Sequence, residues 1–127
     1  MQERHLYEYA VLRVVPRVER EEFVNVGVIV FCKPRRFVKV LFEINAAKIL
    51  CLDKDADLYQ ITKNIESFAR IAHGAKDGGP IAQLETAERF RWLTAVRSSV
   101  IQTSRPHPGL CFEPEEKVAQ LFRELVL

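Results

Sequence analysis

The chain has 127 residues, 48% of them hydrophobic, enough for a single domain (residues 1–127) with one core. Its 19 basic and 17 acidic residues leave a formal net charge of +2, too small to indicate nucleic-acid binding from overall charge. The longest apolar run, residues 26–32, is far too short to span a bilayer. Because residues 1–5 are charged and lack a hydrophobic signal core, we expect a cytoplasmic protein.

Three runs rich in β-branched and aromatic residues follow one another near the start of the chain, at residues 6–15, 24–32 and 36–42. Short polar breaks separate them, and this pattern predicts an antiparallel meander. Strict alternation in the second run predicts one face formed by Val24, Val26, Val28 and Val30 and another formed by Asn25, Gly27, Ile29 and Phe31. Since both faces are largely apolar, we expect this strand to be central and covered on both sides.

The apolar period becomes helical after residue 45. Asp55 or Asp57 can cap a helix whose apolar residues follow a 3-4-3-4 spacing and which ends at Gly74. A second helix is predicted over residues 81–95. Residues 89–96 also alternate as in a strand, so helix and strand both stay open there.

The last third of the chain contains a short strand, a loop and a helix in our prediction. Residues 98–103 indicate a fourth strand, and the two prolines of residues 104–109 favour a rigid loop. The final helix starts near Pro114 and carries an apolar stripe that docks on the sheet. The predicted fold is therefore α+β: an antiparallel sheet of three to four strands, the meander plus one short strand, with about three helices packed mainly on one face.

Five polar residues are candidates for a ligand-binding site: Arg13, Asn25, Arg97, Ser99 and His107. His107 stands between two prolines, where it could act as a base or contact an anion, or simply cap a carbonyl. Arg97 precedes hydroxyl residues, a combination that suits phosphate or carboxylate and that an exposed strand edge explains equally well. Arg13 and Asn25 replace apolar residues in strands, and they would lie side by side if the strands pair in register. An ion pair of Arg13 with Glu8 or with the charged bend is the simpler explanation of Arg13.

Two other groups of residues have simpler explanations. The three cysteines Cys32, Cys51 and Cys111 have no metal-ligand spacing, so we expect free thiols, no metal and no cofactor. The apolar neighbours of Cys32 and Cys51 predict that these two thiols are buried. The basic cluster on the second hairpin could touch nucleic-acid phosphates, or it could discourage aggregation at a sheet edge. Its members are Lys33, Arg35, Arg36 and Lys39.

Four segments together resemble the bacterial domain-of-unknown-function 3037 family (DUF3037). They are residues 7–13, 22–28, 97–99 and 107–110, and the most specific pieces read Asn-Val-Gly-Val and His-Pro-Gly-Leu. The resemblance covers nearly the whole chain. It implies a bacterial, cytoplasmic protein without an assigned reaction, and it suggests a HipA-like kinase as a partner.

The leading functional hypothesis is an accessory or binding protein that acts through a protein partner or a small anionic ligand. The first alternative is an enzyme for a phosphorylated or nucleic-acid substrate, with His107 as acid or base and Arg97 as the anion clamp. The second alternative is a nucleic-acid-binding module that uses the basic hairpin. An enzyme is the less expected of these classes, and nucleic acid and membrane are not expected partners.

Overall fold

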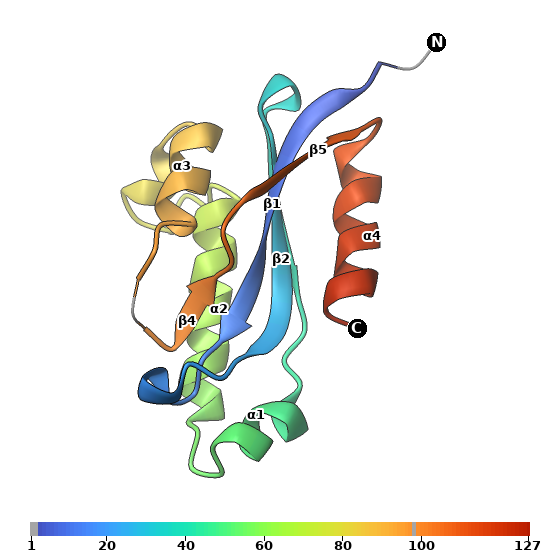
Figure 1. Cartoon of the computed structure of the whole chain (residues 1–127). Coiled ribbons are helices and arrows are strands. Elements are labelled where there is room, and N and C mark those ends of the chain that lie inside the picture. Colours follow the sequence, from blue (N-terminus) through green and yellow to red (C-terminus); the bar gives the residue numbers. More distant parts are fainter. Residues whose placement is uncertain (1–2, 98) are drawn as a thin grey trace.

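The computed structural model describes residues 3–97 and 99–127 and shows an antiparallel sheet with helices on both of its sides (Figure 1). Three short 3-10 turns, Val18–Arg20, Lys33–Arg35 and Ile81–Gln83, lie between the larger elements. The strands are β1 (His5–Val14), β2 (Val24–Cys32), β3 (Phe37–Phe42), β4 (Ile101–Thr103) and β5 (His107–Cys111), and the helices are α1 (Ala46–Leu52), α2 (Leu58–Ala72), α3 (Thr86–Leu93) and α4 (Pro114–Leu125).

The sheet has the order β3-β2-β1-β4, and β5 also pairs with β1. β2 pairs with one edge of β1. Along the other edge, β4 lies opposite Leu12, Arg13 and Val14, whereas β5 lies opposite the residues from His5 to Tyr9. The predicted α+β fold and its meander are confirmed, and β1 has two short strands in series on its outer edge.

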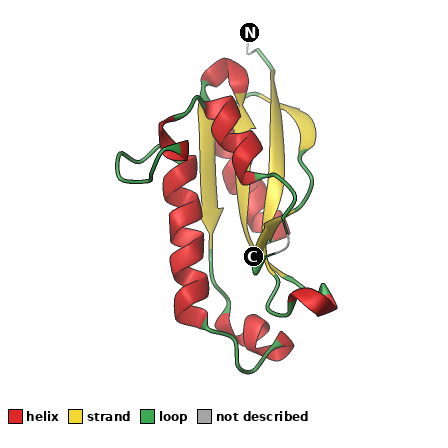
Figure 2. Ribbon diagram, turned by 90° about the vertical axis from the view of Figure 1, so that its left-hand side faces the viewer, coloured by secondary structure: helices red, strands yellow, loops and turns green. Residues whose placement is uncertain are grey.

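Helices pack against both faces of the sheet (Figure 2), and two separate apolar clusters hold them there. The larger cluster joins Leu12, Val26 and Ile29 to residues of α1, α2 and α3, including Ile65 and Phe90. The smaller one joins Val28 and Val30 of β2 to Val118 and Leu121 of α4. Three helices therefore contribute to one face and α4 to the other, which agrees with the prediction of helices mainly on one face.

A β-bulge in β2 changes which residues face each helix layer. Leu12 lies opposite Gly27 and Arg13 lies opposite Asn25, so Val26 is an extra residue in the ladder. The alternation predicted for this strand is wrong beyond that point, because Val28 and Val30 face α4 whereas Val26 faces α2 and α3. The strand is central and covered on both faces, as expected.

Gly27 allows the bulged strand to approach β3 closely. A Cβ atom added to Gly27 would lie 2.7 Å from the backbone oxygen of Leu41 and 3.0 Å from the Cβ atom of Phe42. Because the first contact is with backbone, rotation of a side chain cannot relieve it. The glycine is required by packing between strands, and this leaves no room there for a ligand.

The helices differ in detail from the prediction. Asp57 caps α2, as one of the two expected residues, and its side chain accepts from the backbone N–H of Gln60. α1 was not predicted, although Asn45 caps it in the same manner. The second predicted helix is shorter, because regular α-helix covers only Thr86–Leu93, and the strand interpretation of these residues is wrong.

The last strands also differ from the prediction. β4 begins at Ile101 rather than residue 98, and Ser98 itself lies outside the described residues. β5 replaces the end of the predicted loop, because proline is compatible with an edge strand. In residues 3–97 and 99–127, no helix combines the length and the apolar character needed to cross a membrane.

Ser104 fills the gap between β4 and β5 along β1. Its backbone N–H donates to the oxygen of Val11 at 2.9 Å, and the N–H of Val11 donates to the Ser104 hydroxyl at 2.8 Å. The hydroxyl in turn donates to the oxygen of Arg105 at 3.1 Å. The buried Ser104 side chain thus supplies the hydrogen-bond acceptor that β1 needs between its pairing with β4 and its pairing with β5.

The substitution Gly27→Ala should lower the free energy of unfolding by about 1–3 kcal/mol, because the added methyl group overlaps the β3 backbone. Chemical denaturation followed by circular dichroism measures the change. Gly79→Ala is a comparison that shows backbone strain without overlap: no atom lies within 4 Å of its added Cβ, and its positive φ of 89° should cost about 1–3 kcal/mol. Equal stabilities of Gly27→Ala and wild type would contradict the packing argument.

Replacing Ser104 by alanine should cost about 1–3 kcal/mol of unfolding free energy, since it leaves the buried N–H of Val11 without an acceptor. The matched control is Ser67→Ala, because Ser67 is an exposed serine and its change should stay within about 0.5 kcal/mol. Hydrogen exchange at Val11 should become faster in Ser104→Ala. If exchange at that amide were unchanged, Ser104 would not be closing the ladder.

Candidate functional site

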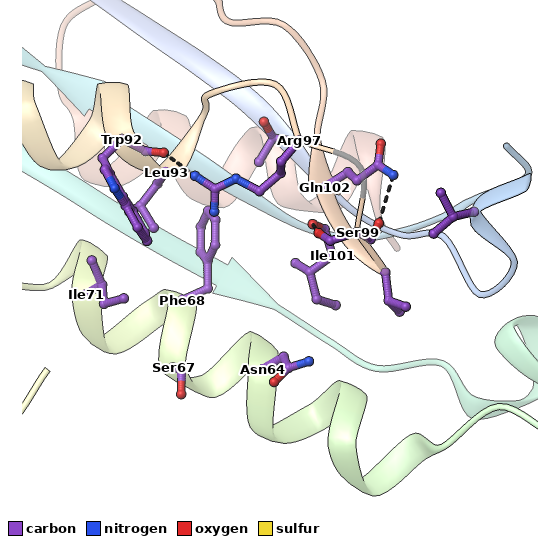
Figure 3. Close-up of a pocket in the computed structure, with 13 residues that line it drawn as sticks. Asn64, Ser67, Phe68, Ile71, Trp92, Leu93, Arg97, Ser99, Ile101 and Gln102 are labelled. Atoms are coloured by element: carbon purple, nitrogen blue, oxygen red, sulfur yellow. Dashed lines mark hydrogen bonds between the residues drawn. The ribbon is translucent and has the colours of Figure 1, made fainter. Parts of the chain in front are cut away.

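A pocket of about 550 Å³ lies between α2, the end of α3 and the segment that leads into β4 (Figure 3). We call it the α2–β4 pocket. Its size is within the usual range for small-molecule sites. The lining residues are Val18, Asn64, Ser67, Phe68, Ile71, Trp92, Leu93, Arg97, Ser99, Val100, Ile101, Gln102 and Thr103.

Apolar side chains form the walls of this pocket. Ile71 points from α2 toward Trp92 and Phe68 points toward the guanidinium of Arg97, whereas Ile101 lies on the β4 side (Figure 3). Trp92 is the single tryptophan of the chain and is 42% exposed, so part of its ring is available to a ligand. A surface of this kind gains free energy when an apolar group covers it.

Arg97 is the one formally charged residue among the described residues that line the α2–β4 pocket. Its guanidinium carbon lies 4.7 Å from the centroid of the Trp92 ring, and Nη2 donates to the backbone oxygen of Trp92. These contacts fix the group at the edge of the apolar wall (Figure 3). Arginine has five N–H donors, so most of them remain available for an anion.

Ser99 and Gln102 shape the loop before β4. The Ser99 hydroxyl donates to the oxygen of Ile101 at 2.6 Å, and Nε2 of Gln102 donates to the oxygen of Ser99 at 2.8 Å. Ser99 thus shares the pocket with Arg97, as the sequence suggested, while its hydroxyl also has a local structural role. Phosphate or carboxylate binding by Ser99 stays a prediction.

The structure places Arg13 beside Asn25, as expected from the strand register. Arg13 also shares a second hollow with Arg97, at the end of the sheet, which we call the Arg13 pocket. The suggested ion pair between Arg13 and Glu8 is wrong, because Glu8 binds Arg91 through two hydrogen bonds of 2.9 and 2.6 Å. Asn25 points elsewhere: its amide donates to the oxygen of Leu125, near the end of α4, at 3.2 Å.

His107 lies apart from both pockets. It is an exposed residue of β5 opposite Tyr9, and the two ring centroids are 5.3 Å apart. The five candidate residues therefore do not meet at one site: Arg97 joins Ser99 in one pocket and Arg13 in the other, whereas Asn25 and His107 line neither. A catalytic pairing of His107 with Arg97 is not supported by this arrangement.

The α2–β4 pocket offers binding groups rather than acid–base groups. Its described lining residues include no histidine, aspartate, glutamate or cysteine. Across residues 3–97 and 99–127, no three such side chains are grouped so that they could hold a metal ion. What the lining does supply is apolar area, one guanidinium and several amide or hydroxyl groups.

Half of the basic cluster on the second hairpin is engaged by carboxylates of the α4 region. Arg35 pairs with Glu113 at 3.2 Å, and Lys39 pairs with Glu115 at 3.0 Å. A phosphate backbone would have to compete with these carboxylates. The arrangement favours a role in attaching the hairpin to α4 over nucleic-acid contact.

The structure has all three cysteines as free thiols. Cys32 and Cys111 are buried, but Cys51 is exposed, so the expectation of a buried thiol is wrong for Cys51. Cys51 belongs to α1, the helix that the sequence pattern missed. Burial raises the pKa of the Cys111 thiol, and the nearby Cys32 adds to this effect, which makes Cys111 a poor nucleophile.

The walls of the α2–β4 pocket were not among the predicted site residues. Phe68 and Ile71 carried only the signal of a helix core stripe, and Asn64 and Ser67 looked like an ordinary exposed helix face. Trp92 offered the best available signal, because tryptophan has a large aromatic surface with one polar group and is enriched at binding surfaces. Its exposure depends on the tertiary fold and could not be read from the sequence.

His73 has a structural role at the outer edge of β3. Its Nε2 atom accepts a hydrogen bond of 3.1 Å from the backbone N–H of Val40, so this nitrogen must be unprotonated. Partial burial lowers the pKa of His73, and the positive charges of Lys39 and Arg89 lower it further. The neutral imidazole thus satisfies a donor that points away from the sheet.

The hydrogen bond between the Val40 N–H and His73 should make the stability of the protein depend on pH. The unfolded chain binds a proton at His73 near pH 6.5, whereas the folded chain binds it at a lower pH. The free energy of unfolding should therefore fall as the pH drops from about 6.5 through the folded pKa, and His73→Gln should weaken that fall. Because the His73 side chain is only partly buried and still meets solvent, which screens its charge, we expect a small effect. Identical pH profiles for the two proteins would rule the contribution out.

Comparisons with known proteins identify a family and nothing more specific. Neither the curated proteins nor the solved structures gave a significant match. The sequence profile described as "Protein of unknown function (DUF3037)" matches residues 9–126. This range contains both pockets and nearly every element of the fold, and the chain belongs to the DUF3037 family.

Proposed function

We propose that this protein binds a small ligand with an apolar body and one anionic group in the α2–β4 pocket. The observation that carries the proposal is the composition of the lining, in which apolar walls surround a single guanidinium, that of Arg97. Ligand sites commonly combine a mostly apolar surface with a few fixed polar groups. The proposal keeps the small-ligand form of the hypothesis drawn from the sequence.

In this proposal, the apolar walls of the pocket contribute most of the binding free energy. Covering apolar surface contributes about 25 cal/mol per Å², so even a modest ligand area contributes several kcal/mol before ordering costs. Phe68 is packed into the larger core, which keeps this wall in place when a ligand leaves. Trp92 provides an aromatic surface on the opposite side.

In this proposal, Arg97 orients the ligand and selects for an anionic group. A guanidinium held against an aromatic ring keeps its planar fork at a fixed angle, and such a fork can donate two parallel hydrogen bonds to a carboxylate. The backbone oxygen of Trp92 fixes one end of the group. A neutral ligand of the same shape would gain only the apolar part of this interaction.

A second candidate function, binding of a protein partner, is favoured by an exposed apolar cluster on the sheet. Leu6 and Leu110 lie opposite each other on β1 and β5 and are 59% and 55% exposed, and Phe112 is 51% exposed. Clusters of this kind mark interaction surfaces. For a co-expressed HipA-like kinase, Leu110→Asp should reduce co-purification and leave ligand binding in the α2–β4 pocket unchanged.

The ligand proposal can be tested with decanoate and 1-decanol as probes, by calorimetry and by Trp92 fluorescence. Decanoate should bind more tightly than decanol, and Arg97→Gln should weaken decanoate about 10- to 100-fold, the effect of losing hydrogen bonds to a charged group. Decanol should lose little, because it does not use the guanidinium. Binding of neither probe would sink the proposal.

Arg105→Gln is the matched control. Arg105 is an exposed arginine a few residues further along the chain, and it lines neither pocket. The substitution Arg105→Gln removes the same charge as Arg97→Gln, so a general electrostatic effect would weaken decanoate binding equally in both variants. Equal losses in Arg97→Gln and Arg105→Gln would exclude a specific role of Arg97.

A further inference from the structure

The Arg13 pocket adjoins the α2–β4 pocket at Arg97. It has a volume of about 520 Å³ at the end of the sheet. Val18, Arg97 and Gln102 line both pockets, so the two pockets meet along these residues. The remaining lining residues of the Arg13 pocket are Arg13, Val15, Glu21, Phe23 and Val96.

Arg13 is held in this pocket by the sheet. It lies on β1 between Gln102 of β4 and Asn25 of β2, and its neighbours Leu12 and Val14 are fully buried in the larger core. Its guanidinium carbon lies 4.1 Å from the centroid of the Phe23 ring. The side chain is thus fixed by backbone pairing below it and by an aromatic ring beside it.

The hydrogen bonding of Arg13 is incomplete. Its Nε atom is buried and has no hydrogen-bond partner. In the described part of the chain, neither Arg13 nor Arg97 forms an ion pair with a carboxylate. A ligand anion would therefore be stabilising, because it would supply the counter-charge that the described carboxylates do not provide to either guanidinium.

We propose that Arg13 and Arg97 together bind the phosphate group of a phosphate monoester whose apolar body occupies the α2–β4 pocket. This rests on the proposed function and names the ligand class. A carboxylate is satisfied by one guanidinium fork, whereas a phosphate monoester carries close to two charges and three terminal oxygens, enough for two forks. The amide of Gln102, which lines both pockets, adds a neutral polar group at the junction.

Glu21 sets an upper limit on the negative charge of the ligand. It is an exposed carboxylate in the lining of the Arg13 pocket, so two cations and one anion leave a formal charge of +1 there. This small excess of positive charge suits one phosphate group better than several. The site therefore favours a monoester over a polyphosphate or a nucleic-acid backbone.

The test compares decyl phosphate with decanoate, 1-decanol and inorganic phosphate at pH 8, where the monoester is a dianion, and at concentrations below micelle formation. Decyl phosphate should bind at least tenfold more tightly than decanoate. Arg13→Gln should remove this preference while leaving decanoate affinity unchanged, because decanoate uses Arg97. Arg105→Gln should keep the preference.

Each result separates the two proposals. If decanoate and decyl phosphate bind equally to wild type, or if Arg13→Gln weakens both to the same extent, the phosphate inference is overturned and the ligand-binding function stands. If inorganic phosphate binds as tightly as decyl phosphate, the apolar body has no role and the inference is also overturned. If no alkyl ligand binds, both proposals are wrong.

Circular dichroism and thermal melting establish that Arg13→Gln is folded. Should that variant be unfolded, Arg13→Lys replaces it, since lysine keeps the charge and the long stem but lacks the planar fork. Arg13→Lys should lose most of the preference for phosphate. Retention of the full tenfold preference in this variant would show that Arg13 does not bind the phosphate through its fork.

Discussion

The mutual hydrogen bonds of Ser104 and Val11 determine how the second half of the chain is attached to the first. Because β1 lies in the interior of the sheet, the backbone N–H and C=O groups along both of its edges need hydrogen-bond partners. On the outer edge no single strand provides them, and β4 and β5 share the task. One buried hydroxyl supplies the acceptor at the junction, so two strands of three and five residues act as one long strand.

The position of β4 follows from that junction, and the pockets follow from the position of β4. Because β4 pairs only with the end of β1, the loop that precedes it reaches α2 and the end of α3. This brings Arg97 beside Trp92 on one side and toward Arg13 on the other. Two arginines that are distant in the sequence thus line one pocket, and neither forms an ion pair with a carboxylate of the described residues.

The sequence was most informative where structure depends on neighbouring residues. The three long strands and the cap of α2 at Asp57 follow from local alternation and capping, and the structure confirms them. The faces of β2 could not be predicted, because the bulge at Val26 depends on how β1 and β3 approach Gly27. β5 was hidden by its prolines, which indicate a loop unless the partner strand is known.

In the candidate site, too, the features set by neighbouring strands could be predicted and those set by distant contacts could not. The register that places Arg13 beside Asn25 could be predicted, since consecutive antiparallel strands pair locally. The separation of His107 from Arg97 could not be predicted, because it arises where β1 stops pairing with β4 and begins pairing with β5, at Ser104. The pocket walls on α2 required the packing of a helix against a distant loop. Such contacts leave no trace in a single sequence.

Both edges of the sheet are obstructed, and this limits how the protein can assemble with other chains. Pro108 in β5 has no N–H to offer to an additional strand, and the outward N–H of Val40 in β3 is already bound by His73. A partner therefore cannot extend the sheet in continuous register at either edge. This favours complexes that form through side chains on a face of the molecule, where shape and charge select the partner more strictly than backbone pairing does.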